Sequence, residues 1–136
     1  MCCAAPTAVA GTRLRSGTAP APTIPALAAK RPVFHSEADF QHAFAWEIHQ
    51  HLPDAYVRLE YRPALLPTRA YVDVWVVDGN QTLAIELKYK TAPLSVQLDD
   101  GEKFDLMSQG AQDLGRYDFV RDLWRLEQVL LVTQTL

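Results

Sequence analysis

The sequence predicts a single α/β domain in which helices flank a mixed β-sheet, in the order α-β-β-β-α-β with an inserted β-hairpin. Three features predict it: a helical period over 36–52, strand-like runs between 58 and 90, and a second helical period over 109–127. A chain of 136 residues can bury one core. Its apolar content of 49% and charged content of 21% are typical of globular proteins.

The first 33 residues are rich in Ala, Pro, Thr and Gly and show no period. They are expected to be a disordered extension, followed by one folded domain over 34–136. The only cysteines, Cys2 and Cys3, are adjacent and offer neither a disulfide nor a zinc spacing. No apolar run has the length of a membrane span or a secretory signal. We therefore expect a cytoplasmic protein without a membrane role.

The first helix is expected to begin after Ser36, because Ser36-Glu37-Ala38-Asp39 is a variant of the capping box with Asp in place of Glu. It should end at about Leu52, before Pro53. Strands are predicted at Arg58–Tyr61, Ala70–Val77 and Leu83–Lys90. The turn signal Asp78-Gly79-Asn80 joins the second and third of these strands.

The rest of the chain predicts three more elements. Leu94–Leu106 should form a hairpin, because apolar and polar residues alternate around the turn signal Asp100-Gly101. Gln109 to about Glu127 favour a helix, and Val129–Val132 a closing strand.

Asp73 breaks the apolar pattern of the second strand, and burying a carboxylate there is costly unless something compensates it. A two-residue loop at Gly79-Asn80 places Asp73 opposite Glu86, with Cβ atoms roughly 5 Å apart. A four-residue loop over 78–81 gives the same register. An Asp78-Gly79 loop makes the pair diagonal, still within reach of a shared ion.

Directly opposed carboxylates repel each other across a sheet. A divalent cation resolves this conflict, and Mg²⁺ or Mn²⁺ prefers such oxygen ligands. Lys88 follows Glu86 by two residues and shares its face, so its ammonium group can reach a phosphate oxygen held there. Glu-x-Lys alone is a common pattern on exposed strands, and it is the position of Asp73 that favours a site.

Glu47 supplies a third candidate acid. At about 100° per residue it falls inside the apolar stripe formed by Phe40, Phe44 and Ile48. Its head group could instead reach solvent from the edge of the stripe. We favour a role in the same site, because this helix should pack on the sheet.

The second helix begins with the polar residues Gln109, Asp113 and Arg116, on a face that becomes apolar at Val120 and Leu123. These residues could bind substrate phosphate, with Arg116 the best suited. A capped and solvated helix start explains them equally well. The tryptophans are interpreted as core or rim packing residues in preference to base-stacking platforms: Trp46, Trp75 and Trp124.

The segments Tyr71–Trp75 and Leu83–Lys90 resemble the PD-(D/E)XK, or restriction-endonuclease-like, nuclease superfamily and its uncharacterised bacterial members. The order of elements from Ser36 to Val132 is similar to that family's core. By this resemblance Asp73 is the acid of the first half-motif, which here reads Val-Asp instead of Pro-Asp. Glu86 and Lys88 are then the acid and lysine of the second half-motif.

The resemblance implies an Mg²⁺-dependent endonuclease that hydrolyses nucleic-acid phosphodiester bonds, with DNA favoured over RNA. Asp73, Glu86 and the Leu87 carbonyl would bind the ion, Glu47 would support it, and Lys88 would position the attacking water. Cutting both strands of a duplex needs two sites, which a homodimer would provide. The alternative is a non-catalytic domain that binds nucleic acid or a protein partner, and the net charge of −3 favours it mildly.

Overall fold

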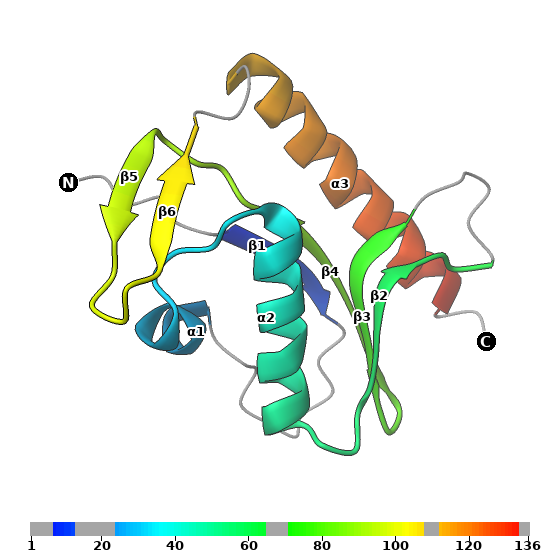
Figure 1. Cartoon of the computed structure of the whole chain (residues 1–136). Coiled ribbons are helices and arrows are strands. Elements are labelled where there is room, and N and C mark those ends of the chain that lie inside the picture. Colours follow the sequence, from blue (N-terminus) through cyan, green and yellow to red (C-terminus); the bar gives the residue numbers. More distant parts are fainter. Residues whose placement is uncertain (1–6, 13–23, 65–70, 108–111, 134–136) are drawn as a thin grey trace.

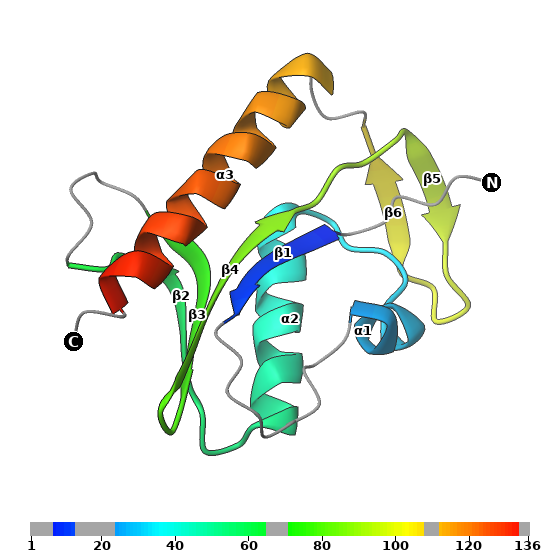
Figure 2. The same ribbon diagram turned by 180° about the vertical axis from the view of Figure 1, so that it is seen from behind.

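The computed structural model describes residues 7–12, 24–64, 71–107 and 112–133. A four-stranded sheet lies between two helices, with α2 (Glu37–His51) on one face and α3 (Gln112–Thr133) on the other (Figures 1 and 2). The prediction of an α/β fold is thus confirmed at this level. Among the described helices, none combines the length and apolar character that crossing a membrane requires.

Helix α2 begins where its cap predicts. The Ser36 hydroxyl accepts a hydrogen bond from the Asp39 backbone N–H at 3.1 Å, which satisfies one of the free donors of the first turn. The helix ends at His51, and the Leu52 N–H bonds back to the Ile48 carbonyl. The predicted boundaries are therefore confirmed to within a residue.

The central hairpin consists of β3 (Val72–Asp78) and β4 (Gln81–Lys88). Asp78 pairs with Gln81, so Gly79-Asn80 is the two-residue loop, and Gly79 has the positive φ of 55° that such a turn requires. The ladder continues to the pair Val74 and Ile85. The predicted register is correct.

The sheet has the order β1-β4-β3-β2, with β1 (Thr7–Thr12) and β2 (Tyr56–Tyr61) on its two edges. Every pair in it is antiparallel, so the expectation of a mixed sheet is wrong for the described residues. The predicted closing strand at Val129–Val132 is also wrong, because α3 continues through it to Thr133. A short apolar run without Gly or Pro does not stop a helix that is already formed.

The expectation of disorder over residues 1–33 is wrong for two stretches. Strand β1 pairs along β4, which would otherwise be a free edge. Helix α1 (Ile24–Lys30) buries Leu27 in the main core and places Lys30 beside α2. Both segments are short and rich in small residues, so neither gives a strong periodic signal.

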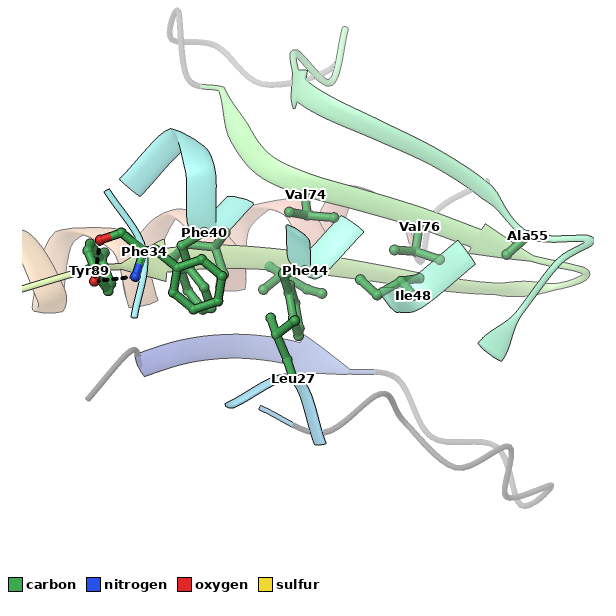
Figure 3. Packing of buried hydrophobic residues seen from close by; sticks show 11 residues of the cluster. Leu27, Phe34, Phe40, Phe44, Ile48, Ala55, Val74, Val76 and Tyr89 are labelled. Atoms are coloured by element: carbon green, nitrogen blue, oxygen red, sulfur yellow. Dashed lines mark hydrogen bonds between the residues drawn. The ribbon is translucent and has the colours of Figure 1, made fainter. Parts of the chain in front are cut away.

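The main core lies between α2 and the sheet. Figure 3 shows Phe40, Phe44 and Ile48 of α2 packed toward Val74 and Val76 of β3. The Tyr89 hydroxyl closes one end of this core, because it donates to the Phe34 carbonyl at 2.7 Å and accepts from the Phe34 N–H at 3.0 Å. A smaller cluster on the opposite face joins Leu126 of α3 to the sheet residues Val72, Trp75 and Ala84.

A separate hairpin of β5 (Leu94–Gln97) and β6 (Lys103–Leu106) follows β4, as predicted. It lies beside α1 and the start of α2 (Figure 1). Phe104 of β6 is buried and stacks on the ring of His35 at 4.2 Å. Because His35 directly precedes the Ser36 cap, the hairpin braces the beginning of α2.

Candidate functional site

A cavity of about 520 Å³ opens at the end of the β3–β4 hairpin that is farthest from its turn. The start of α2, the ends of β2, β3 and β4, and the middle of α3 contribute its walls. Five acids, three cations and two aromatic residues line it: Glu37, Glu60, Asp73, Glu86, Asp122, Lys88, Arg121, Arg125, Tyr71 and Trp124. Three of the four residues predicted as catalytic, Asp73, Glu86 and Lys88, therefore share one cavity.

Asp73 lies where the β3–β4 ladder stops. Its Oδ2 accepts the Leu87 N–H at 2.6 Å, so the carboxylate occupies the position that a strand carbonyl would take in the ladder. The N–H and C=O of one residue leave an antiparallel strand on the same side, so the Leu87 carbonyl also faces the gap between β3 and β4. Burial raises the pKa of Asp73 despite this hydrogen bond, and Glu60 and Glu37 add to the rise.

Glu86 is only 3% exposed and lies on the face of the sheet that α3 covers. Burial, followed by the negative charge of Asp73, raises its pKa to about 8. Hydrogen bonding with the Asp73 carboxyl group adds to the rise in the pKa of Glu86. The pair therefore holds a proton near neutral pH, which relieves the repulsion expected from the facing positions.

The cations of the cavity are held by Asp122, a buried residue of α3. Lys88 Nζ lies 2.7 Å from Asp122 Oδ2, and Arg125 Nη1 donates to Asp122 Oδ1 at 3.0 Å. Arg125 Nη2 in turn lies 3.2 Å from Glu86 Oε1 and also donates to the Tyr71 carbonyl. Although burial lowers the pKa of Lys88, the Asp122 carboxylate outweighs it, so the pKa is raised and the ammonium stays charged.

Two further acids approach from the edge of the sheet. Glu37, in the first turn of α2, accepts the Tyr89 N–H at 2.9 Å through Oε2. Glu60 has a positive φ of 49°, and the ladder between β2 and β3 skips it. The buried Gln41 amide fills the gap, because it donates to Glu60 Oε1 at 2.8 Å and to the Asp73 carbonyl at 2.7 Å.

The structure does not bring Glu47 to this cavity. Glu47 is buried, as its position in the apolar stripe predicts, but both its oxygens accept from Lys30 Nζ at 2.7 Å and Oε1 lies 3.5 Å from His51 Nδ1. The reason is geometric: α2 covers one face of the sheet, whereas Glu86 and Lys88 project toward α3 on the other. The acid that α2 contributes is Glu37, whose place at the helix start reaches around the sheet edge.

The phosphate-binding role predicted for the start of the second helix concerns side chains that the structure does not describe. Gln109 lies outside the described residues, as do the side chains of Asp113 and Arg116 within α3. The apolar part of this face is exposed, with Val120 63% and Leu123 37% accessible. Asp122 and Leu126 face the sheet. Residues four apart share one face of a helix, so this spacing identifies the inner face of α3. The sequence does not reveal this face readily, because one of its two residues, Asp122, is charged.

Within the described residues, no group of three or more His, Cys, Asp or Glu side chains is arranged to hold a metal ion. Asp73 and Glu86 nevertheless form a convergent pair. Magnesium commonly binds to one or two carboxylates and completes its octahedron with water and substrate phosphate. The donor chemistry of this pair therefore fits Mg²⁺ or Mn²⁺, with the ion replacing the shared proton.

Comparison of the chain with protein-family models, with curated proteins and with solved structures found no match.

Proposed function

We propose that the protein is a metal-dependent nuclease with a restriction-endonuclease-like core, hydrolysing phosphodiester bonds of nucleic acid. The observation that carries this proposal is the convergence of Asp73, Glu86 and Lys88 on one cavity. Two acids on facing strand ends beside an ammonium group form a site that can bind a cation and a phosphate together.

The chain's own residues divide the work. Asp73 and Glu86 would hold Mg²⁺ or Mn²⁺, and the Leu87 carbonyl would join them. When bound, the ion lowers the pKa of a coordinated water and neutralises charge on the scissile phosphate. Lys88 donates a hydrogen bond to the attacking water or to a phosphate oxygen, and so stabilises the negative charge that develops during attack. Asp122 keeps the ammonium charged and aimed into the cavity.

A cleavage assay tests the proposal. Plasmid DNA, single-stranded DNA and RNA are incubated with the full chain and Mg²⁺, Mn²⁺ or EDTA. Cleavage is expected with either ion and not with EDTA. Asp73→Asn, Glu86→Gln and Lys88→Met should each lower the rate by about 100-fold or more, the scale on which a charge-stabilising group acts.

Matched controls exclude a contaminating nuclease. Asp99→Asn and Lys103→Met change exposed residues of the β5–β6 hairpin that do not line the cavity, and they should keep wild-type rates. If Asp73→Asn and Lys88→Met retain full activity, the proposed site is wrong.

One observation favours the alternative of a non-catalytic, nucleic-acid-binding or protein-binding domain. Two cations of the cavity are already engaged by one of its acids, since Lys88 and Arg125 both pair with Asp122. Isothermal titration calorimetry separates the two functions. Binding of Mg²⁺ or Mn²⁺ that Asp73→Asn abolishes supports catalysis, and no heat at millimolar metal supports the alternative.

A further inference from the structure

Two aromatic side chains stand at the mouth of the cavity. Tyr71, directly before β3, is 46% exposed, and Trp124 of α3 is 53% exposed. Both line the same cavity as Asp73 and Glu86. Tyr and Trp are enriched at binding interfaces, because each combines a large apolar ring with a polar group.

These aromatic residues are tied to the acids by the structure itself. Arg125 donates to the Tyr71 carbonyl and also contacts Glu86, so one guanidinium links the backbone at Tyr71 to an acid of the cavity. Trp124 follows Arg121 by three residues on α3, which places both on one side of the helix. Arg121 also lines the cavity. An aromatic ring beside a guanidinium is a combination on which nucleobases stack.

The charges of the chain and of its cavity do not favour binding of a duplex. The chain has a net charge of −3, whereas duplex binding depends largely on phosphate neutralisation by free cations. Each cation of the cavity already pairs with an acid: Lys88 and Arg125 share Asp122, and Arg121 pairs with Asp118. Affinity must then come from another source. Stacking can supply it, but only where the faces of the bases are not covered by neighbouring base pairs.

We infer that the cavity takes an unpaired nucleotide, with its base against Trp124 and Tyr71 and its phosphate directed to Lys88, beside the cation site proposed at Asp73 and Glu86. This inference rests on the proposed function and names its substrate class: single-stranded nucleic acid, including unpaired tails. Trp124 and Tyr71 act as specificity residues that select unpaired bases.

Binding of the full chain is measured by fluorescence anisotropy, with Ca²⁺ in place of Mg²⁺ to slow cleavage. Three labelled probes are used: a thymine oligonucleotide, an abasic strand of equal length, and the oligonucleotide as a duplex. The oligonucleotide should bind more tightly than the other two. Trp124→Ala and Tyr71→Ala should each weaken this binding by about 5- to 100-fold, the range for loss of one stacked base. Trp124→Phe and Tyr71→Phe should largely retain it.

The chain offers matched controls. Trp46 is 64% exposed on α2 and Tyr56 is 51% exposed on β2, and neither lines the cavity. Trp46→Ala and Tyr56→Ala should leave binding within twofold of the wild type. A second readout is intrinsic fluorescence in the Trp46→Phe chain, where Trp124 is the exposed tryptophan and Trp75 the buried one. The oligonucleotide should quench it, and the added change Trp124→Phe should remove the quenching.

The outcomes separate this inference from the proposed function. If oligonucleotide binding depends on Trp124 but the chain cleaves no nucleic acid, the inference is supported and the proposed nuclease activity is wrong. Asp73-dependent cleavage of duplex DNA that Trp124→Ala leaves unchanged supports the nuclease and overturns the inference. The inference also fails if Trp124→Ala converts a dimer to a monomer without altering oligonucleotide binding, because the aromatic surface is then a contact between two copies.

Discussion

Asp122 is the residue on which the charges of the cavity depend. It is 3% exposed and faces two cations, Lys88 and Arg125. A buried carboxylate flanked by two partners is stabilised only while both remain charged and close. Removing its charge leaves two partly buried cations without a negatively charged partner. The fold should then be less stable, and Lys88 should be held less firmly in position.

We therefore expect Asp122→Asn to lower the free energy of unfolding by about 1–3 kcal/mol, the usual cost of disrupting a buried charged hydrogen bond. The matched control is Asp118→Asn, since Asp118 makes an exposed pair with Arg121 at 2.8 Å. That change should cost less than about 0.5 kcal/mol. Urea denaturation of both variants measures the difference. Equal effects would show that burial of Asp122 has no energetic consequence.

The carboxyl pair predicts a dependence of stability on pH. The pKa of Glu86 is about 8 in the folded protein, against an ordinary value of 4.5. Folding therefore favours its neutral form, and this stabilisation is complete below about pH 4.5 and is lost as the pH rises through 8. Around Glu86, Asp73 and Asp122 raise the pKa and Arg125 lowers it.

Glu86→Gln removes this titration. We expect the metal-free wild type to lose stability relative to Glu86→Gln between pH 5 and pH 8.5, a window bracketing the values above. Thermal melting of both chains measures the difference, and Asp99→Asn is the control for an exposed acid. A difference between the curves that does not change with pH would contradict the burial of a neutral Glu86.

The sequence predicts which strand residues meet at the site better than it predicts which helix residues do. Alternation and a two-residue turn suffice to bring Asp73 and Glu86 together, because both depend on local geometry alone. Glu47 was assigned to the site because its helix should pack on the sheet. Which face the helix covers is decided by tertiary packing, and no period within 37–51 contains that information.

The pair of Glu47 and Lys30 has a structural role, because it connects two helices. It links α1 to α2 through two hydrogen bonds of 2.7 Å, next to the buried Leu27. Glu47→Gln should therefore lower the free energy of unfolding by about 1–2 kcal/mol, reduced from the value for a fully buried pair because Lys30 is largely exposed.

The same variant distinguishes a structural acid from a catalytic one. At a temperature where it is folded, Glu47→Gln should keep the wild-type kcat for cleavage. Glu37→Gln, which changes the α2 acid that lines the cavity, should alter activity instead. If Glu47→Gln lowers kcat as much as Asp73→Asn does, Glu47 takes part in catalysis and its role is not structural alone.

Element ends that carry a specific cap or turn motif are predicted correctly, and the end of α3, which carries none, is not. Ser36 and Gly79-Asn80 mark a helix start and a turn by specific backbone chemistry, and both are found where predicted. The run Val129–Val132 has no such signal, and a short apolar segment fits a strand or a helix equally well. Its continuation of α3 is decided by the helix that precedes it.

In the molecule as a whole, α2 and α3 cover opposite faces of one sheet (Figures 1 and 2). The cavity is lined by residues of both helices and of the strand ends. Elements from residue 37 to residue 125 contribute to it. The acids therefore converge only in the folded chain. An ion that needs this convergence binds the native state and not the unfolded one, so metal binding and folding should be linked.

We therefore expect Mg²⁺ to raise the melting temperature of the wild type. A site filled at 100 times its Kd stabilises the native state by about 2.7 kcal/mol. The rise should be larger at pH 8.5 than at pH 6.5, because the ion must displace the proton that Asp73 and Glu86 share. Asp73→Asn and Glu86→Gln should abolish it, and Asp99→Asn should retain it. NaCl at equal ionic strength controls for screening of the cavity's charges. If NaCl raises the melting temperature as much as Mg²⁺, the carboxyl pair does not bind the ion specifically.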